Sequence, residues 1–107
     1  LALLGYGRIA QRVAAVAAAI GMRVRAFSPN LRKAGDISPT EKSPDLVALL
    51  GGADVLSLHA PLTDSTRGAV GAAELDLLAP GAIVVNTSRG GVVDEFALAS
   101  ALRSGRL

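Results

Sequence analysis

The chain opens with LALLGYGRIA, residues 1–10, in which a short apolar strand runs into a glycine-rich turn. The turn fits the pattern G-x-G-x-x-G/A, with alanine in the last place. Gly5 permits a tight turn, Gly7 lets the backbone approach a pyrophosphate with no Cβ in the way, and Ala10 keeps the following helix close to the sheet. The N–H groups after Gly7 are expected at a helix N-terminus, where they would face phosphate groups.

The residues that follow the turn indicate a helix. Ile9, Val13, Val16 and Ile20 recur at spacings of four, three and four, which places them on one face of a helix, and Gly21 is a good C-terminal stop. A glycine-rich turn is weak evidence alone, and the plain alternative is a strand–helix turn without a ligand. Here the turn follows a strand and opens an amphipathic helix, and this context favours a dinucleotide site.

The rest of the chain alternates between the two kinds of element. Further strands are expected at residues 22–27, 55–58 and 82–85, and further helices at residues 44–50, 72–78 and 95–104. Ser43 and Asp94 are expected to cap the second and the last helix. The strands are continuous apolar runs, which indicates burial on both faces and therefore a parallel sheet between helices. The expected fold class is α/β, a doubly wound sheet of Rossmann type.

Composition excludes several classes of function. The chain has 107 residues, 50% of them hydrophobic and 3% aromatic, so one domain with an Ala, Val, Leu and Ile core is expected. The net charge is only +2, without a basic run, which disfavours nucleic-acid binding. No cysteine is present, so a thiolate metal site is impossible and no metal is expected. The apolar run at residues 13–22 is far shorter than the ~20 residues of a membrane span.

Both ends suggest a truncated domain. Residue 1 is not a start methionine, residues 1–4 read as the inside of a strand, and the chain stops just after a helix. We therefore expect residues 1–107 to form a partial dinucleotide-binding domain, with the substrate or catalytic domain absent from this chain.

The end of the second strand bears on the choice of cofactor. The fingerprint normally has an acidic residue about 20 positions on, which holds the adenosine ribose. Ser28 stands there instead, and Arg32 and Lys33 follow closely. Loss of the acid removes repulsion against a 2′-phosphate, and two cations could pair with one, which leans toward NADP over NAD. The alternative is that Arg32 and Lys33 belong to a solvated loop.

The loop NTSRGGVVDE, residues 86–95, is the most informative stretch. With a strand order of 3-2-1-4, the first and fourth strands would be neighbours, so this loop would face Gly5 across the crevice where ligands bind. Arg89 would then sit where a substrate meets the nicotinamide. Its guanidinium can hold a carboxylate with two hydrogen bonds and polarise a neighbouring carbonyl oxygen. Asp94 is better interpreted as a helix cap than as a catalytic acid.

The sequence resembles the NAD(P)-binding domain of the D-isomer-specific 2-hydroxyacid dehydrogenases over essentially its whole length. The resemblance rests on four stretches, at residues 5–10, 53–63, 66–68 and 80–95. In that family the arginine matching Arg89 binds the carboxylate and keto oxygen of the substrate. The expected catalytic residue is therefore Arg89, and the expected cofactor-binding residues are Gly5, Gly7, Arg8, Ile9, Ser28, Arg32, Ala60, Pro61, Thr66, Thr87, Ser88 and Arg89.

The resemblance also implies what the chain lacks. The family's catalytic histidine and the carboxylate that orients it come later in the chain and have no counterpart here, so residues 1–107 alone are expected to be inactive. His59 is the only histidine. It matches a loop residue of the family and is expected two strands away from Arg89, so we do not assign it a catalytic role.

The expected function is an NAD(P)-dependent oxidoreductase that interconverts a small D-2-hydroxy acid and its 2-keto acid. The resemblance further implies a homodimer, and the absence of cysteine agrees with the expected cytoplasmic location. One alternative is a dinucleotide-binding scaffold that resembles the transcriptional co-repressors related to this family, in which Arg89 would also be present. An adenosylhomocysteinase-like hydrolase shares the glycine-rich start but has no reason to carry residues 86–95.

Overall fold

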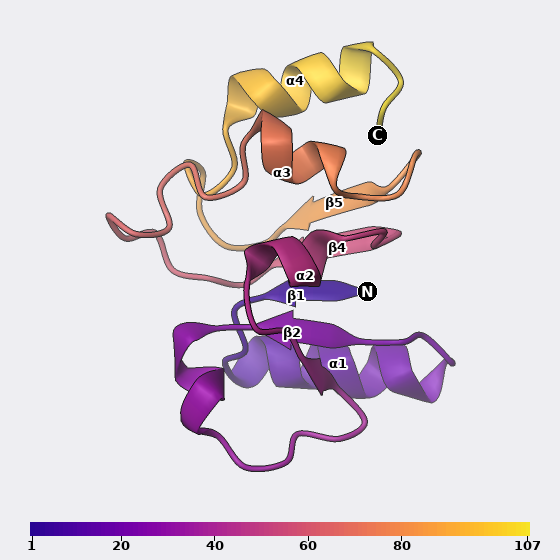
Figure 1. The fold of residues 1–107 in the computed structure, drawn as a ribbon, viewed down its shortest axis with the longest axis vertical. Coiled ribbons are helices and arrows are strands. Elements are labelled where there is room, and N and C mark those ends of the chain that lie inside the picture. Colours follow the sequence, from indigo (N-terminus) through magenta and orange to yellow (C-terminus); the bar gives the residue numbers. More distant parts are fainter.

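The computed structural model describes all of residues 1–107 as a five-stranded parallel sheet with helices on both faces (Figure 1). The strands are β1 (Ala2–Leu4), β2 (Arg25–Phe27), β3 (Glu41–Lys42), β4 (Val55–Leu58) and β5 (Ile83–Asn86). The helices are α1 (Arg8–Ala19), α2 (Leu46–Leu50), α3 (Ala72–Asp76) and α4 (Glu95–Arg103), with the 3-10 helix η1 (Pro29–Lys33) after β2. The α/β fold class expected from the sequence is confirmed.

The order of the strands differs from the expected one. The sheet runs β3-β2-β1-β4-β5, so β4 lies between β1 and β5. Leu4 pairs with Leu58, which in turn pairs with Asn86. The prediction that the first strand adjoins residues 82–85 is wrong, because it counted four strands and missed β3. That strand is only two residues long and joins the sheet through main-chain bonds, with the N–H of Glu41 donating to the carbonyl of Val24 at 2.8 Å.

Helix α1 covers one face of the sheet with its alanines. Ala10, Ala14 and Ala17 are buried, whereas Ile9 and Ile20 are 69% and 73% exposed. The apolar stripe seen in the sequence is thus real, but it is not the buried face. Alanine has no side chain beyond Cβ, so this face allows the helix axis to lie close to the sheet, and the larger residues are left on the outside.

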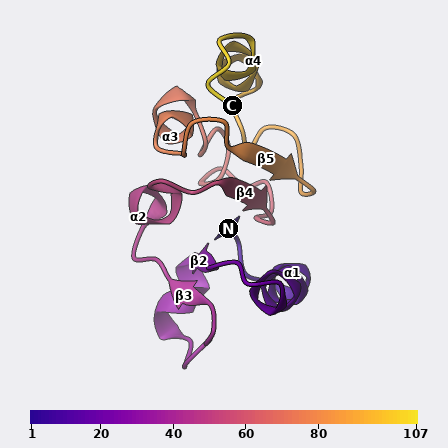
Figure 2. The ribbon, with the colours of Figure 1, turned by 90° about the vertical axis from the view of Figure 1, so that its right-hand side faces the viewer.

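The other face carries α2 and α3, as Figure 2 shows with the sheet seen nearly on edge. Leu49, Leu56 and Leu75 are fully buried there in the larger of two hydrophobic clusters, and α4 packs against α3. Helix α2 begins after Asp45, whose carboxylate accepts a hydrogen bond from the N–H of Ala48 at 2.7 Å. The expected cap at Ser43 is therefore wrong, since the chain turns into the helix two residues later.

Strand β5 forms an edge of the sheet. Ile83 and Val85 are exposed, so the expected burial of every strand on both faces does not hold for this one. Asp94 caps α4 as expected, accepting hydrogen bonds from the N–H groups of Phe96 and Ala97 at 2.9 and 3.1 Å. None of the helices combines the length and the apolar character needed to cross a bilayer.

Candidate functional site

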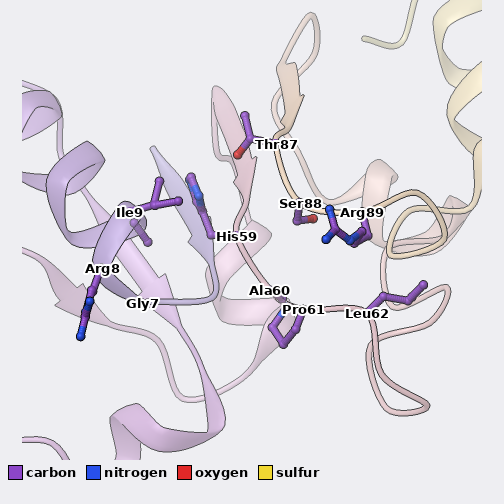
Figure 3. Close-up of a pocket in the computed structure, with 11 residues that line it drawn as sticks. Gly7, Arg8, Ile9, His59, Ala60, Pro61, Leu62, Thr87, Ser88 and Arg89 are labelled. Atoms are coloured by element: carbon purple, nitrogen blue, oxygen red, sulfur yellow. The ribbon is translucent and has the colours of Figure 1, made fainter.

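The carboxyl ends of β1, β4 and β5 meet at one edge of the sheet, and the loops after them enclose a cleft. Two adjoining cavities of about 820 and 740 Å³ share Gly7, His59 and Pro61 and form its two halves. Both fall in the size range of small-molecule sites. Figure 3 shows the first cavity, with Ile9 and His59 on one side and Ser88 and Arg89 on the other.

The turn between β1 and α1 forms one wall of the cleft. Gly5 has a φ of +94°, and a Cβ there would lie 2.7 Å from the backbone of the loop after β4. Gly7 is the N-cap of α1, and a Cβ built on it meets nothing within 4 Å, so its backbone faces open space. The N–H groups of the first turn of α1 have no acceptor within the helix. This turn has the geometry that a pyrophosphate requires.

The loop after β5 forms the opposite wall and is organised by Asn86. Its side-chain oxygen accepts hydrogen bonds from the N–H and hydroxyl of Ser88 at 3.0 and 2.8 Å, and its amide donates to the carbonyl of Arg89 at 3.1 Å. The hydroxyl of Thr87 donates to the carbonyl of Leu58 at 3.4 Å, which fastens the loop to β4. The guanidinium of Arg89 is exposed and forms no salt bridge, so it is free to bind an anion.

The loop after β4 closes the floor of the cleft between these walls. Ala60 and Pro61 line it, and the hydroxyl of Ser57 lies 2.8 Å from Nε2 of His59. Burial lowers the pKa of His59 below its ordinary value, which favours the neutral ring. The expectation that two strands separate His59 from Arg89 is wrong, because β4 and β5 are neighbours and both residues line the first cavity.

Thr66 lies beside the cleft without lining either cavity. Its hydroxyl donates to the carbonyl of Pro61 at 2.6 Å, so it braces the loop that carries Leu62. Two further contacts join this loop to the one after β5, namely a bond from the N–H of Gly68 to the carbonyl of Gly91 at 2.6 Å and a parallel bridge formed by Val70 and Val93. Thr66 therefore supports the loop that lines the cleft, without lining the cleft itself.

The second cavity extends from Gly5 and Ser28 toward the loop after η1. Arg32 does not line it, and its guanidinium instead donates to the carbonyl of Pro44 at 3.3 Å. Asp36 does line it, although no sequence motif singles that residue out. A signal was available in the composition of the segment, because Asp36 is the only acidic residue between Ser28 and Glu41.

The chain holds no group of three or more histidine, cysteine, aspartate or glutamate side chains arranged to bind a metal ion. The site consists of backbone N–H groups, hydroxyls, the guanidinium groups of Arg8 and Arg89, one imidazole and the carboxylate of Asp36 around an open cleft. Such a set suits a phosphate-bearing ligand at the turn and an anionic molecule at Arg89. Of the expected site residues, the structure brings together Gly7, Arg8, Ile9, Ala60, Pro61, Thr87, Ser88 and Arg89 in the first cavity.

Comparison with curated proteins gives a consistent set of relatives. The chain is 40% identical over 107 residues to the glycerate dehydrogenase of Methylorubrum extorquens, covering 100% of this chain and 32% of that protein. It is 44% identical over 105 residues to the glyoxylate reductase of Aeropyrum pernix, covering 98% of this chain and 31% of that protein. The chain thus spans about a third of the length of these relatives.

Solved structures agree with these sequences. The D-lactate dehydrogenase of Escherichia coli superposes with a TM-score of 0.88 and 31% identity, covering 98% of this chain and 33% of that one. The NAD-complexed D-isomer specific 2-hydroxyacid dehydrogenase of Lactobacillus delbrueckii ssp. bulgaricus superposes with a TM-score of 0.86 and 33% identity, covering 98% and 31%. The family described as D-isomer specific 2-hydroxyacid dehydrogenase, NAD binding domain, matches residues 1–107 in full. The chain therefore belongs to the family of NAD-binding domains of the D-isomer-specific 2-hydroxyacid dehydrogenases.

Proposed function

We propose that residues 1–107 are the cofactor-binding part of an NAD(P)-dependent oxidoreductase that interconverts a small D-2-hydroxy acid and its 2-keto acid. The observation that carries the proposal is the single cavity shared by the first turn of α1 and by Arg89. A phosphate site and an unpaired guanidinium on facing walls are what a dinucleotide and a carboxylate substrate need in order to meet. The dehydrogenases and reductases among the relatives support this assignment.

The cofactor residues divide by position in the cleft. The backbone of Gly7, Arg8 and Ile9 would hold the pyrophosphate through the N–H groups at the start of α1. The side chain of Arg8 points away from Arg89 (Figure 3). Ala60 and Pro61 would contact the adenosine half, and Thr87 and Ser88 the nicotinamide half. When bound, the nicotinamide supplies or accepts the hydride. After β5, the first cavity is lined by Thr87, Ser88 and Arg89, so Arg89 is the only charged side chain at that end of the cavity.

Arg89 would orient the substrate. Its planar fork can bind the carboxylate through one edge while another N–H points at the keto oxygen, and this charge stabilises the oxygen as it becomes an alkoxide. Asn86 would set the direction of this side chain, because it holds the carbonyl of Arg89 and the N–H of Ser88 in one loop. Alignment of the reacting atoms contributes more to catalysis than affinity alone.

The keto oxygen also needs a proton. We propose that a general acid, a histidine paired with a carboxylate, comes from a substrate domain outside residues 1–107, as the family resemblance implies. His59 lies in the first cavity, but its ring is engaged by Ser57 and its lowered pKa disfavours the protonated form. A homodimer is a further proposal that rests on the resemblance alone, and a cytoplasmic location is one that rests on the absence of cysteine.

The test is turnover by the intact protein. NADH and NADPH oxidation would be followed with glyoxylate, hydroxypyruvate and pyruvate, three small 2-keto acids. Saturable turnover of at least one of them is expected, with formation of the D-hydroxy acid checked by chiral chromatography. Tight dinucleotide binding without turnover of any 2-keto acid would instead favour the scaffold alternative, which none of the relatives described above supports.

A further inference from the structure

The second cavity carries a negative charge from a residue that the sequence motif does not include. Of all the side chains that line it, Asp36 is the only one with a formal charge at neutral pH, since the pKa of His59 is lowered by burial. Ser28, at the end of β2, lines the same cavity, as do Gly5 and Gly7 of the glycine-rich turn. In this fold an acid at the end of the second strand commonly binds the adenosine ribose. The cavity therefore has the expected charge, supplied by a residue on another segment.

The nearby cations do not reach this cavity. Arg32 and Lys33 are both exposed and neither lines it, and the guanidinium of Arg32 is engaged by the carbonyl of Pro44. The ammonium group of Lys42 donates to the carbonyl of Ala34 and also stays outside the lining. The two cations that favoured NADP in the sequence, Arg32 and Lys33, thus both lie outside the lining of this cavity, and Arg32 is bonded elsewhere.

Asp36 is held in a defined position. One of its carboxylate oxygens, Oδ1, accepts hydrogen bonds from the N–H and the hydroxyl of Ser38 at 2.9 and 2.7 Å. These bonds lower the pKa of Asp36 below its ordinary value, and the charge of Lys42 acts in the same direction. The hydrogen bonds leave Oδ2 available as an acceptor. The loop itself is tied to the glycine-rich turn, because the hydroxyl of Tyr6 donates to that of Thr40 at 3.3 Å.

We propose that Asp36 takes the place of the carboxylate missing at Ser28 and makes the site select NAD(H) over NADP(H). The inference rests on the proposed function, because it assumes that the second cavity holds the adenosine ribose. A 2′-hydroxyl is a hydrogen-bond donor that a carboxylate oxygen can accept. A 2′-phosphate has no proton to offer at neutral pH and carries a charge that Asp36 repels, with no cation in the cavity to offset it.

The experiment measures dissociation constants for NADH and NADPH on the intact protein, by fluorescence titration at low salt. Three proteins are compared: the wild type, Asp36→Asn and Arg32→Ala. The amide introduced by Asp36→Asn would keep an oxygen that can accept from Ser38, so the loop should stay in place while the charge is lost. Arg32→Ala tests the competing explanation, in which this exposed cation pairs with a 2′-phosphate although it lies outside the lining of the cavity.

The wild type is expected to bind NADH at least about tenfold more tightly than NADPH, and Asp36→Asn should shrink that ratio by about tenfold, mostly through tighter NADPH binding. Arg32→Ala should leave the ratio unchanged. A wild-type preference for NADPH, or a ratio that falls with Arg32→Ala and not with Asp36→Asn, would overturn the inference. Failure of the proposed function has a different signature, which is either binding without turnover of any 2-keto acid or no binding of either dinucleotide to any of the three proteins.

Discussion

Gly5 packs directly against Ala60, so that a β-carbon built on Gly5 would lie 2.7 Å from the backbone nitrogen of Ala60. This contact joins the turn after β1 to the loop after β4. Both segments line the cleft, and their close approach sets the distance between the α1 terminus and the floor that Ala60 and Pro61 form. The glycine thus serves the fold and the site together.

Replacement of this glycine should be costly. Gly5→Ala adds a β-carbon at a φ of +94° and forces it into backbone atoms that cannot move aside. We expect a loss of about 2–4 kcal/mol in the free energy of unfolding, from strain and overpacking combined. Gly21→Ala is the control, since its φ of +88° brings similar strain with nothing within 4 Å of the added carbon. Equal losses in the two variants, measured by urea denaturation, would show that the contact with Ala60 is unimportant.

Gly7 should behave in the opposite way. A β-carbon on Gly7 meets nothing within 4 Å, and the glycine has no positive φ, so Gly7→Ala should change the free energy of unfolding by less than about 1 kcal/mol. The added methyl group would, however, occupy the space where the pyrophosphate approaches the backbone.

We therefore expect Gly7→Ala to weaken dinucleotide binding by at least about tenfold, or 1.4 kcal/mol, in a fluorescence titration. Gly51→Ala is the matched control, because Gly51 ends α2 far from the cleft and its β-carbon would make only an ordinary contact at 3.5 Å. Normal affinity in Gly7→Ala would move the pyrophosphate away from this turn.

Arg89→Lys tests the role of the guanidinium fork. Lysine keeps the positive charge but cannot grip two oxygens in one plane. We expect kcat/KM to fall by an amount equivalent to about 2–4 kcal/mol, with part of the loss in kcat, because orientation matters most in the transition state. Cofactor affinity should change little. Arg103→Lys, in the last turn of α4, is the control. Both variants would be tested by steady-state kinetics and by cofactor titration. A loss of dinucleotide binding alone in Arg89→Lys would reassign Arg89 to the cofactor site.

His59 should make stability depend on pH. Burial lowers its pKa in the folded chain below the ordinary 6.5, so the unfolded chain binds a proton more readily in mild acid. The stability that this neutral ring contributes should be complete above about pH 6.5 and decline as the pH falls toward the folded pKa. Since His59 is the only histidine, His59→Gln should flatten the decline between about pH 7 and pH 5.5. The free energy of unfolding of both proteins would be measured by urea denaturation at each pH. An equal decline in wild type and variant would contradict this assignment.

Much of the fold follows from local chemistry that the sequence displays directly. The glycine pattern of residues 5–10, the cap at Asp94 and the apolar runs each depend on neighbouring residues. The turn and the cap lie where the sequence predicts, and the apolar runs contain the strands, although β2 begins at Arg25 and not at residue 22. The α/β class and the gathering of Arg89 with the glycine-rich turn follow from the same signals. The helical face of α1 was ambiguous, because its alanines and its branched residues are both apolar, and only packing against the sheet decides which side is buried.

The tertiary structure decided what depends on partners distant in sequence. Strand β3 has two polar residues and no periodicity, so only its bonds to β2 define it. Because β3 takes the place next to β2, β4 lies between β1 and β5, and His59 lines the same cavity as Arg89. The position of Asp36 in the second cavity is likewise decided by a contact that is distant in sequence. Asp36 lies there because its loop is bonded at Thr40 to the distant Tyr6, and such a long-range contact leaves no pattern in the local sequence.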